Sequence, residues 1–429
     1  MAQTLTRDDC AALDARDPLR ELRSLFTLPG GVNYLDGNSL GVMPAAAPAR
    51  AAEVVQREWG EGLIRSWNTA GWITLPQRVG DKIARLIGAR PGEVVAADAT
   101  SVNLYKVLSA AIEIAKVDRP GRRVILSERS NFPTDLYIAQ SLARQHGFEL
   151  ELAASDEIAA RLDERVAVLM LTQVNYRTGA LHDMAGLTAR AHQVGALALW
   201  DLCHSAGAVP VDLHGADADF AIGCGYKYLN GGPGAPAFVW THPRHTDRFW
   251  QPLSGWMGHA SPFTFDTAYR PAEGVSRYLC GTPSVIGLSV LECGVDTLLA
   301  AEPLGGMAEL RAKSLALSDL FIAQVEARCA GHGLRSVGPA DRERRGSQVS
   351  LACASATAYA VMQALIARGV IGDFRAGDGS EAEPDLLRFG FTPLYTRFVD
   401  VHDAVTALSE ILSTEQWREA RFNQKAAVT

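Results

Sequence analysis

Short apolar runs alternate with longer amphipathic stretches through the first two thirds of the chain. Several of these runs are continuously apolar, such as VAVLML at 166–171 and ALALW at 196–200. Continuous runs of this length are typical of strands that are covered by helices on both faces. The pattern therefore predicts an α/β fold, a three-layer αβα sandwich with a mostly parallel sheet. The expected strands are 94–97, 123–127, 148–152, 166–171, 196–200, 219–223 and 236–240.

The pattern changes near residue 300 and predicts a smaller α+β domain over 300–429. Its expected elements are a helix at 302–330, a strand at 347–353, a helix at 355–368, a strand at 386–391 and a helix at 400–413. We expect residues 1–45 to form an arm that packs with this small domain, and 46–299 to form the large domain. A chain of 429 residues exceeds what one core usually supports, so two domains are the natural expectation.

Composition narrows the class of protein. Hydrophobic residues make up 48% of the chain and charged residues 21%, as in ordinary globular proteins. The net charge of -7 offers no overall positive field for nucleic acid. The chain has no apolar run of about 18 residues to span a bilayer, and its start lacks the apolar stretch of a signal peptide. We therefore expect a cytoplasmic protein with small-molecule partners, binding neither nucleic acid nor membrane.

The seven cysteines are an odd number, are scattered, and contain no C-x-x-C pair. This spacing favours reduced thiols and gives no sign of a zinc or redox site. We expect no metal.

The most informative segment is GYKYLNGGPG at 225–234, directly after the strand expected at 219–223. Lys227 stands between two tyrosines, whereas the other five lysines lie in polar segments typical of solvated ammonium groups. Desolvation by aromatic neighbours would lower the pKa of Lys227 and make it a better imine former, and the glycines that follow it would let the backbone pass close to a ligand. A lysine that snorkels past the rings to solvent is the alternative.

Asp201 ends the run ALALW and stands 26 residues before Lys227. Ligands of open α/β sheets gather at such strand ends. A pyridoxal ring works as an electron sink when a buried carboxylate keeps its nitrogen protonated, and Asp201 is suited to this. Together, Asp201 and Lys227 predict a pyridoxal 5'-phosphate enzyme. A helix N-cap is the alternative role for Asp201.

Two further strand ends carry candidate cofactor ligands. Thr100 and Ser101 stand where a helix should begin, and can bind a phosphate or cap the helix. Phe132 and Asp135 follow the expected strand 123–127. Phe132 is placed to stack on a planar ring and Asp135 to bond near it, and a hydrophobic staple is the alternative.

Six motifs together resemble kynureninase, and they span the chain from about 34 to 400. They are GNSLG at 37–41, FPTD at 132–135, DLCH at 201–204, GYKYLNGGPG at 225–234, WMGH at 256–259 and RFGFTPLY at 388–395. The resemblance implies a fold-type I pyridoxal-phosphate enzyme of the class-V aminotransferase-like family, working as a homodimer with active sites at the subunit boundary. It also implies hydrolysis of L-kynurenine to anthranilate and L-alanine, in tryptophan degradation.

Carried over position by position, the resemblance makes Lys227, Tyr226 and Asp201 the catalytic residues. Lys227 carries the cofactor and moves the substrate α-proton, Asp201 holds the pyridine nitrogen, and Tyr226 is the expected proton donor. The implied cofactor contacts are Thr100, Ser101, Phe132, Asp135, Thr172, His204, Tyr226 and, from the second subunit, Trp256 and Thr282.

The implied substrate contacts are Arg388, Ser39 and Trp67. We expect Arg388 to bind the substrate carboxylate bidentately, with Arg375 as its rival, since an acidic loop at 376–385 separates the two arginines. Ser39 and Trp67 would line the pocket for the aryl ring, although a core or interface role suits Trp67 equally. Thr282 resembles the bacterial form that prefers kynurenine over its 3-hydroxy analogue.

Three rival interpretations remain open. A cysteine desulfurase needs a nucleophilic cysteine on a mobile loop, whereas Cys329 and Cys353 fall in an expected helix and strand. An aminotransferase would share Lys227 and Asp201. A non-catalytic pyridoxal-phosphate binder would lose proton-transfer or substrate groups, whereas Tyr226, Lys227 and Arg388 are present.

Overall fold

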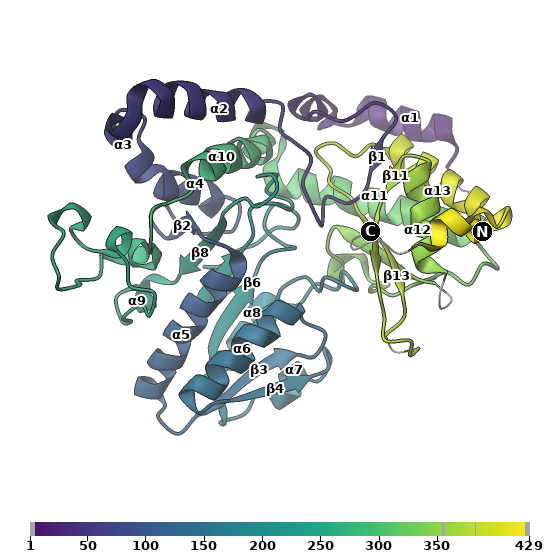
Figure 1. The fold of residues 1–429 in the computed structure, drawn as a ribbon. Helices are drawn as coiled ribbons and strands as arrows, with labels where there is room; N and C mark the ends of the chain where they lie inside the picture. Colours follow the sequence, from purple (N-terminus) through teal and green to yellow (C-terminus); the bar gives the residue numbers. More distant parts are fainter. Residues whose placement is uncertain (1–4, 354–356, 382, 425–429) are drawn as a thin grey trace. The chain divides into compact units, whose positions relative to one another are not determined.

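The computed structural model describes residues 5–353, 357–381 and 383–424 (Figure 1). The described residues form two compact units. The larger unit contains Ala46–Asn175 and His182–Asp296, and the smaller one contains the residues up to Ala45, Tyr176–Leu181 and the chain from Thr297 onward. We propose domain boundaries on this basis: an arm at 1–45, a large domain at 46–299 and a small domain at 300–429.

The larger unit is built on a seven-stranded sheet in the order β2-β8-β7-β6-β5-β3-β4. The strands are β2 (Val94–Ala97), β3 (Val124–Glu128), β4 (Glu149–Ala153), β5 (Val166–Thr172), β6 (Leu197–Asp201), β7 (Phe220–Gly223) and β8 (Ala237–Thr241). All seven expected strands are confirmed to within one residue at each end. Strand β8 runs antiparallel to both of its neighbours, while the other pairings are parallel. The mostly parallel sheet is therefore confirmed.

Helices cover both faces of this sheet, as the continuously apolar strands require. The α-helices of the larger unit are α2 (Ala47–Glu53), α3 (Ser66–Thr69), α4 (Leu75–Ala84), α5 (Thr100–Asp118), α6 (Pro133–His146), α7 (Ile158–Arg161), α8 (Met184–Val194), α9 (Pro243–Thr246) and α10 (Val285–Leu299). The connections through α5 and α6 step along the sheet towards β4, whereas those through α7 and α8 step back towards β6. Because parallel crossovers are right-handed, the two pairs lie on opposite faces. Figure 1 shows α5 and α6 side by side over one face.

The smaller unit holds a four-stranded antiparallel sheet in the order β12-β13-β10-β9. Its elements are α1 (Arg7–Arg16), β1 (Asn33–Tyr34), α11 (Gly306–Arg328), β9 (Arg335–Ser336), β10 (Gln348–Ala352), α12 (Ala358–Ala367), β11 (Val370–Ile371), β12 (Asp373–Arg375), β13 (Leu386–Gly390) and α13 (Phe398–Ser413). Strand β1 pairs in parallel with β11, so a segment near the N-terminus joins the C-terminal part of the chain. The described part of the chain contains no helix that is both long and apolar enough to cross a bilayer.

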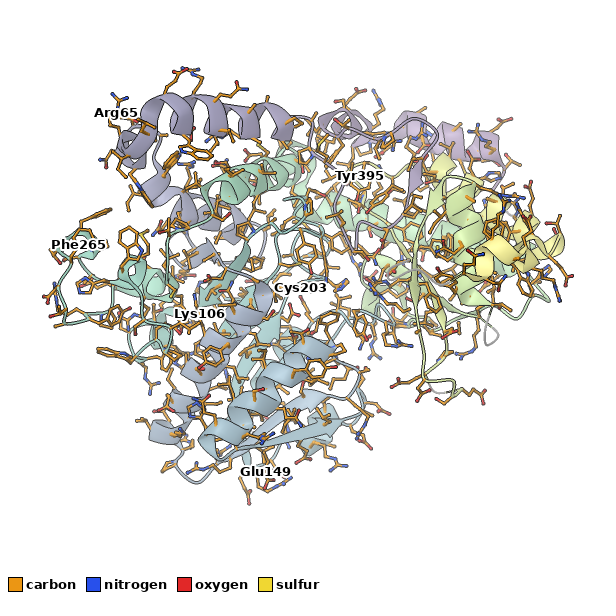
Figure 2. All side chains as sticks on the ribbon, viewed as in Figure 1. Arg65, Lys106, Glu149, Cys203, Phe265 and Tyr395 are labelled. Carbon is orange, nitrogen blue, oxygen red and sulfur yellow. The ribbon has the colours of Figure 1, made fainter. Side chains whose placement is uncertain are left out.

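Two buried lysines correct the expectation that every lysine except Lys227 is solvated. Lys106, on α5 and labelled in Figure 2, is fully buried and donates to the Asp98 carboxylate and to the Tyr278 carbonyl, each at 2.5 Å. Lys313 is also buried, and its Nζ lies 2.6 Å from the Asp17 carboxylate. Each ammonium group is therefore paired with a carboxylate, which is buried in the case of Asp17 and partly exposed in the case of Asp98.

A buried carboxylate, Asp219, fixes the start of β7. It accepts hydrogen bonds from His192 at 2.8 Å, from the Arg244 guanidinium at 2.6 Å and from the Ala198 amide at 2.7 Å. Burial alone would raise the pKa of Asp219, but hydrogen bonds from His192 and His245 and the charge of Arg244 hold it well below its usual range. The folded protein therefore stabilises the charged form of the Asp219 carboxyl group.

We predict that Asp219→Asn lowers the free energy of unfolding by about 3–5 kcal/mol, because it breaks a buried charged network while leaving Arg244 without its buried partner. Urea unfolding at pH 7 measures this change. The matched control is Asp217→Asn, whose side chain is 60% exposed, and it should cost under about 1 kcal/mol.

The pH dependence has a definite sign. Because the folded pKa of Asp219 is depressed, its contribution is complete above the unfolded pKa of about 3.9 and is lost as the pH falls towards the folded value. The stability gap between wild type and Asp219→Asn should therefore shrink in acid. Equal effects of the two variants at pH 7 would contradict this role for Asp219.

Candidate active site

The carboxyl ends of the parallel strands carry most of the predicted site residues. Thr172 ends β5 and Asp201 ends β6, and the two residues are register partners. Thr100 follows β2 at the start of α5, Asp135 follows β3 in the first turn of α6, and Lys227 follows β7. Loops from these strand ends meet at one edge of the sheet, as in other open α/β sheets that bind ligands there.

Lys227 lies among the predicted aromatic and imidazole groups. Its Nζ is 2.9 Å from His204 Nε2, 5.9 Å from the centre of the Phe132 ring and 5.7 Å from the centre of the Tyr226 ring. His204 follows Asp201 by three residues, so a single turn after β6 supplies both the imidazole and the carboxylate. The amine therefore points into the site, and the snorkelling alternative does not describe it.

The glycines of the 225–234 loop serve two purposes. A side chain at Gly225 would meet the carbonyl oxygen of Pro236 at 2.2 Å, so this glycine is required by the protein's own packing. Gly234 has a φ of +72°, and no other group lies within 4 Å of the position its Cβ would occupy. Our expectation that the glycines after Lys227 let the backbone pass close to a ligand fits Gly234, which lines the cavity described below.

The pKa of Lys227 is shifted in the direction opposite to the one we expected. Burial alone would lower it, but the negative charges that Cys224, Cys203, Tyr226 and Asp201 can carry raise it above its ordinary value. The expectation of a depressed pKa is therefore wrong for the protein without cofactor. The physical reason is that acidic groups on neighbouring loops outweigh the desolvation caused by the rings.

Two buried carboxyl groups stand side by side in the site. The Thr172 hydroxyl lies 3.4 Å from Asp135 Oδ2 and 3.4 Å from Asp201 Oδ2, and Asp201 Oδ1 accepts a hydrogen bond from the Cys203 amide at 2.7 Å. Burial and the neighbouring Asp201 raise the pKa of Asp135 well above its usual range. Two adjacent buried carboxylates favour a cationic partner, and a protonated pyridine nitrogen supplies that charge. The site thus fits the ring end of pyridoxal phosphate.

A cavity of about 350 Å³ beside α5 fits the phosphate end. Its lining includes Thr100, Tyr226 and Thr282, together with Gly234 and Ser284. The 19-residue helix α5 begins at Thr100 and directs its first amides towards this end. Helix N-termini with adjacent hydroxyls are suited to phosphate, so the residues present fit both ends of the cofactor.

The structure does not support the N-cap alternative for Thr100 and Ser101 or the hydrophobic-staple alternative for Phe132. The N-cap of α5 is Ala99, so neither Thr100 nor Ser101 occupies the capping position. Ser101 follows Thr100 inside the helix and is partly buried, outside the lining of the cavity. Phe132 is itself the N-cap of α6 and is 42% exposed, whereas a hydrophobic staple would need it one position earlier.

Trp256 lies apart from the phosphate cavity of its own chain. Its ring centre is 6.1 Å from that of Trp67, in an open groove that Phe263 and Phe265 also line. Phe265 is labelled in Figure 2. The prediction that Trp256 and Thr282 act from a second subunit stays a prediction, and Thr282 of the same chain already lines the cavity with Thr100.

The predicted carboxylate-binding group lies in the smaller unit. Arg388, on β13, is 1% exposed and donates to Ser39 Oγ at 2.8 Å, to the Tyr176 carbonyl at 2.8 Å and to the Asp373 carboxylate. Its rival Arg375 binds the same Asp373, at 2.9 Å. Both candidate arginines thus share one carboxylate, which the sequence pattern did not predict.

Several residues near the site were not predicted from sequence. Asn131 accepts a hydrogen bond from Thr172, and Asp373 and Asp36 lie with the two arginines. Asn131 directly precedes the predicted FPTD motif, and that position at a strand end was the available signal. Strand β12, which carries Asp373, has only three residues and gives no periodic pattern.

The strand order, the strand-end Asp201 and the lysine after β7 define a pyridoxal-phosphate-dependent enzyme of fold type I. The fold is similar to a cysteine desulfurase from Thermococcus onnurineus NA1, with a TM-score of 0.76, 19% identity and coverage of 92% of this chain and 98% of that one. It is also similar to a C-DES variant with glycine covalently linked to its pyridoxal-phosphate cofactor, with a TM-score of 0.77, 16% identity and coverage of 90% and 99%.

The sequence comparisons are more specific. The family model for the kynureninase C-terminal domain matches residues 310–408. A kynureninase from Burkholderia pseudomallei (strain K96243) is 57% identical over 427 residues, covering 99% of this chain and 100% of that protein. A kynureninase from Pseudomonas fluorescens is 56% identical with the same coverage. The chain belongs to the kynureninase family.

We predict that Lys227→Ala removes the visible absorbance band of the covalently bound cofactor together with turnover, because the variant has no amine at this position. Absorbance spectra of the protein purified with pyridoxal phosphate measure the band. The matched control is Lys116→Ala on the same unit, whose ammonium pairs with Glu113 at 2.6 Å, and it should keep both. A variant without turnover but with the band intact would overturn the assignment of Lys227.

Proposed function

We propose that the protein hydrolyses the bond between the β and γ carbons of L-kynurenine, giving anthranilate and L-alanine, and acts more weakly on 3-hydroxy-L-kynurenine. The observation that carries this proposal is the 57% identity to a kynureninase along the full length of both chains. The arrangement of Lys227, Asp201 and the phosphate cavity supports it independently. The reaction belongs to tryptophan degradation.

The residues have distinct roles in this proposal. Thr100, Tyr226 and Thr282, which line the cavity, hold the phosphate together with Ser101 from the first turn of α5. Phe132 stacks on the ring, and Asp135, Thr172 and His204 contact its edge. Asp201 holds the proton of the pyridine nitrogen. When bound, pyridoxal phosphate supplies an electron sink for the substrate carbon framework.

Proton transfer is left to two side chains of the loop after β7. Lys227 Nζ removes the proton of the substrate α-carbon when its amine is unprotonated and can therefore act as a base. Tyr226 donates a proton to the alanine fragment. Burial raises the pKa of Tyr226 to about 12, so its phenol keeps its proton throughout the neutral range and is a donor.

Four side chains are the proposed substrate contacts. Arg388 binds the substrate carboxylate, with Arg375 as the second candidate, and Ser39 and Trp67 contact the aryl ring. Ser39 accepts a hydrogen bond from Arg388 at 2.8 Å, which ties these two proposed contacts together.

We also propose that the protein is a cytoplasmic homodimer. The groove around Trp67 and Trp256 exposes apolar rings, with Phe263 55% and Phe265 76% exposed. Apolar patches of this kind mark interaction surfaces. A second copy seated there would bring Trp256 to the boundary between subunits.

A cysteine desulfurase is not favoured. Cys329 is 3% exposed at the C-cap of α11, and Cys353 is buried directly after β10. Neither position gives the mobile, accessible thiolate that sulfur transfer needs.

Incubation of the purified protein with L-kynurenine tests the proposed reaction. We expect anthranilate fluorescence to appear with an equal amount of L-alanine, quantified by chromatography. Transfer of the amino group to an added keto acid, without anthranilate, would instead indicate an aminotransferase. A protein that carries the cofactor and turns over neither way would support the non-catalytic alternative.

Tyr226→Phe separates the two roles of this phenol. Loss of a proton donor should lower kcat by about 10²-fold or more in protein saturated with cofactor. Loss of a phosphate ligand alone should weaken cofactor binding and leave kcat unchanged. The measurement is kcat and the cofactor dissociation constant, with Tyr137→Phe as the control, since Tyr137 is 64% exposed on α6.

A further inference from the structure

A compact charged cluster surrounds Arg388 in the smaller unit. The Asp373 carboxylate binds both Arg388 and Arg375, and Ser39 Oγ lies 2.8 Å from Arg388 Nη2 and 3.4 Å from Asp373 Oδ2. Asp373 and Arg388 are register partners on β12 and β13, so the sheet itself sets their contact. Asp36 joins the cluster from the turn after β1, where its carbonyl accepts from the Ser39 amide at 2.9 Å.

Three polar atoms of this cluster are buried and lack a hydrogen-bond partner within the described part of the chain. They are Nε of Arg388, Nε of Arg375 and Oδ1 of Asp36. Buried polar atoms without partners are costly and call for a ligand or a proton to satisfy them. Two guanidinium N–H groups are suited to a carboxylate, and a carboxyl oxygen is suited to carrying a proton.

The net charge of the cluster depends on Asp36. Two arginines and the Asp373 carboxylate leave one positive charge when Asp36 carries a proton. A charged Asp36 cancels it. An anionic ligand is therefore favoured electrostatically only while Asp36 is neutral.

We propose that Asp36 is a positioning residue for substrate binding, whose protonated carboxyl keeps the Arg388–Arg375–Asp373 cluster positively charged towards the substrate α-carboxylate. This inference rests on the proposed function of Arg388 and deepens it. Asp36 acts through the arginines and takes no part in bond breaking. Its protonation state sets the affinity for the carboxylate and leaves the chemical step unchanged.

The groups that face Asp36 support a neutral carboxyl. Burial and the Asp373 carboxylate raise the pKa of Asp36 to about 7, although Arg388, the Ser39 hydrogen bond and Arg375 act in the opposite direction.

Tyr34 and Tyr395 are further titratable groups near Asp36. Tyr34 donates its hydroxyl to the Asp36 carbonyl at 3.3 Å, and Tyr395 lies close enough for its ionised form to interact with Asp36. Burial raises the pKa of both phenols, so both stay neutral. Asp36 is thus the group of this cluster that changes charge between pH 6 and pH 8.5.

The test compares wild type with Asp36→Asn, in which the side chain is neutral at every pH. The probe is L-alanine, which carries the α-carboxylate and needs no turnover, and its dissociation constant for the holoenzyme is measured by calorimetry at pH 6 and pH 8.5. For wild type we expect binding to weaken by about tenfold or more at the higher pH, the effect of one added charge nearby. For Asp36→Asn we expect a change of less than about twofold.

Asp403→Asn is the matched control, because Asp403 forms an exposed pair with Arg7 in the same unit, and it should keep the wild-type pH dependence. Kinetics with L-kynurenine give a second readout. Asp36→Asn should remove the rise of KM above pH 7 and leave kcat within about twofold. A merely structural role would lower kcat and stability without changing the pH profile.

The outcomes separate this inference from the proposed function. Normal anthranilate formation with the same pH dependence in wild type and Asp36→Asn would overturn the inference alone. Absence of anthranilate, with L-alanine binding that loses its pH dependence in Asp36→Asn, would overturn the proposed reaction and keep the carboxylate site. Wild type that fails to bind L-alanine at either pH would overturn the inference.

A measurement on wild type alone covers the case in which Asp36→Asn does not fold. In holoenzyme with ¹³C-labelled aspartate carboxyls, one carboxyl should titrate near pH 7, and its titration should move to higher pH when L-alanine is bound. This shift is the reciprocal of the expected change in binding. A spectrum in which all carboxyls titrate in the ordinary acidic range would overturn the inference.

Discussion

The buried carboxyl pair of Asp135 and Asp201 is the electrostatic constraint around which the larger unit organises its chemistry. Burial and the neighbouring Asp201 raise the pKa of Asp135 well above its usual range. In our proposal, the protonated nitrogen of the cofactor ring supplies the positive charge that favours two carboxylates side by side. The parallel strands make the arrangement possible, since β5 and β6 end at register partners and α6 begins after β3.

The smaller unit has the opposite imbalance of charge, because two arginines pair with one carboxylate. Arg388 and Arg375 share Asp373, and a neutral Asp36 leaves one positive charge in this cluster. In our proposal, the two carboxyl groups of the larger unit favour a cationic ring, and the positive charge of the smaller unit favours an anionic substrate group. In this proposal, each unit contains buried charged groups that are not fully paired with opposite charges. Such groups lower the stability of the protein and favour binding of a ligand with the opposite charge.

Much of the fold follows from the sequence because the signals are long and local. Seven strands of the larger unit were predicted to within one residue, since buried parallel strands such as 166–172 are continuously apolar. Strands β1, β9, β11 and β12 were not predicted, because two or three residues show no period. The inclusion of Tyr176–Leu181 in the smaller unit depends on tertiary contacts that no local pattern records.

The positions of Lys227 and Asp201 were predictable, because both follow clear strand signals and strand ends of such sheets meet at one edge. Sequence reasoning failed where the outcome depends on a sum of nearby charges. The pKa of Lys227 is raised because Cys224, Cys203, Tyr226 and Asp201 outweigh its burial. The sequence around Lys106 is typical of a solvated helix residue, but the structure buries Lys106, which donates to Asp98. That two arginines share Asp373 depends on the register of β12 and β13, which no local sequence pattern records.

The central claim is that Asp201 keeps a pyridine nitrogen protonated within a buried pair of carboxyl groups. The most direct measurement is the ¹⁵N chemical shift of the ring nitrogen in holoenzyme reconstituted with ¹⁵N-labelled pyridoxal phosphate, recorded from pH 6 to pH 9. The account predicts a protonated nitrogen whose shift does not change across this range. A shift typical of a neutral pyridine nitrogen, or one that titrates near neutrality, would contradict it.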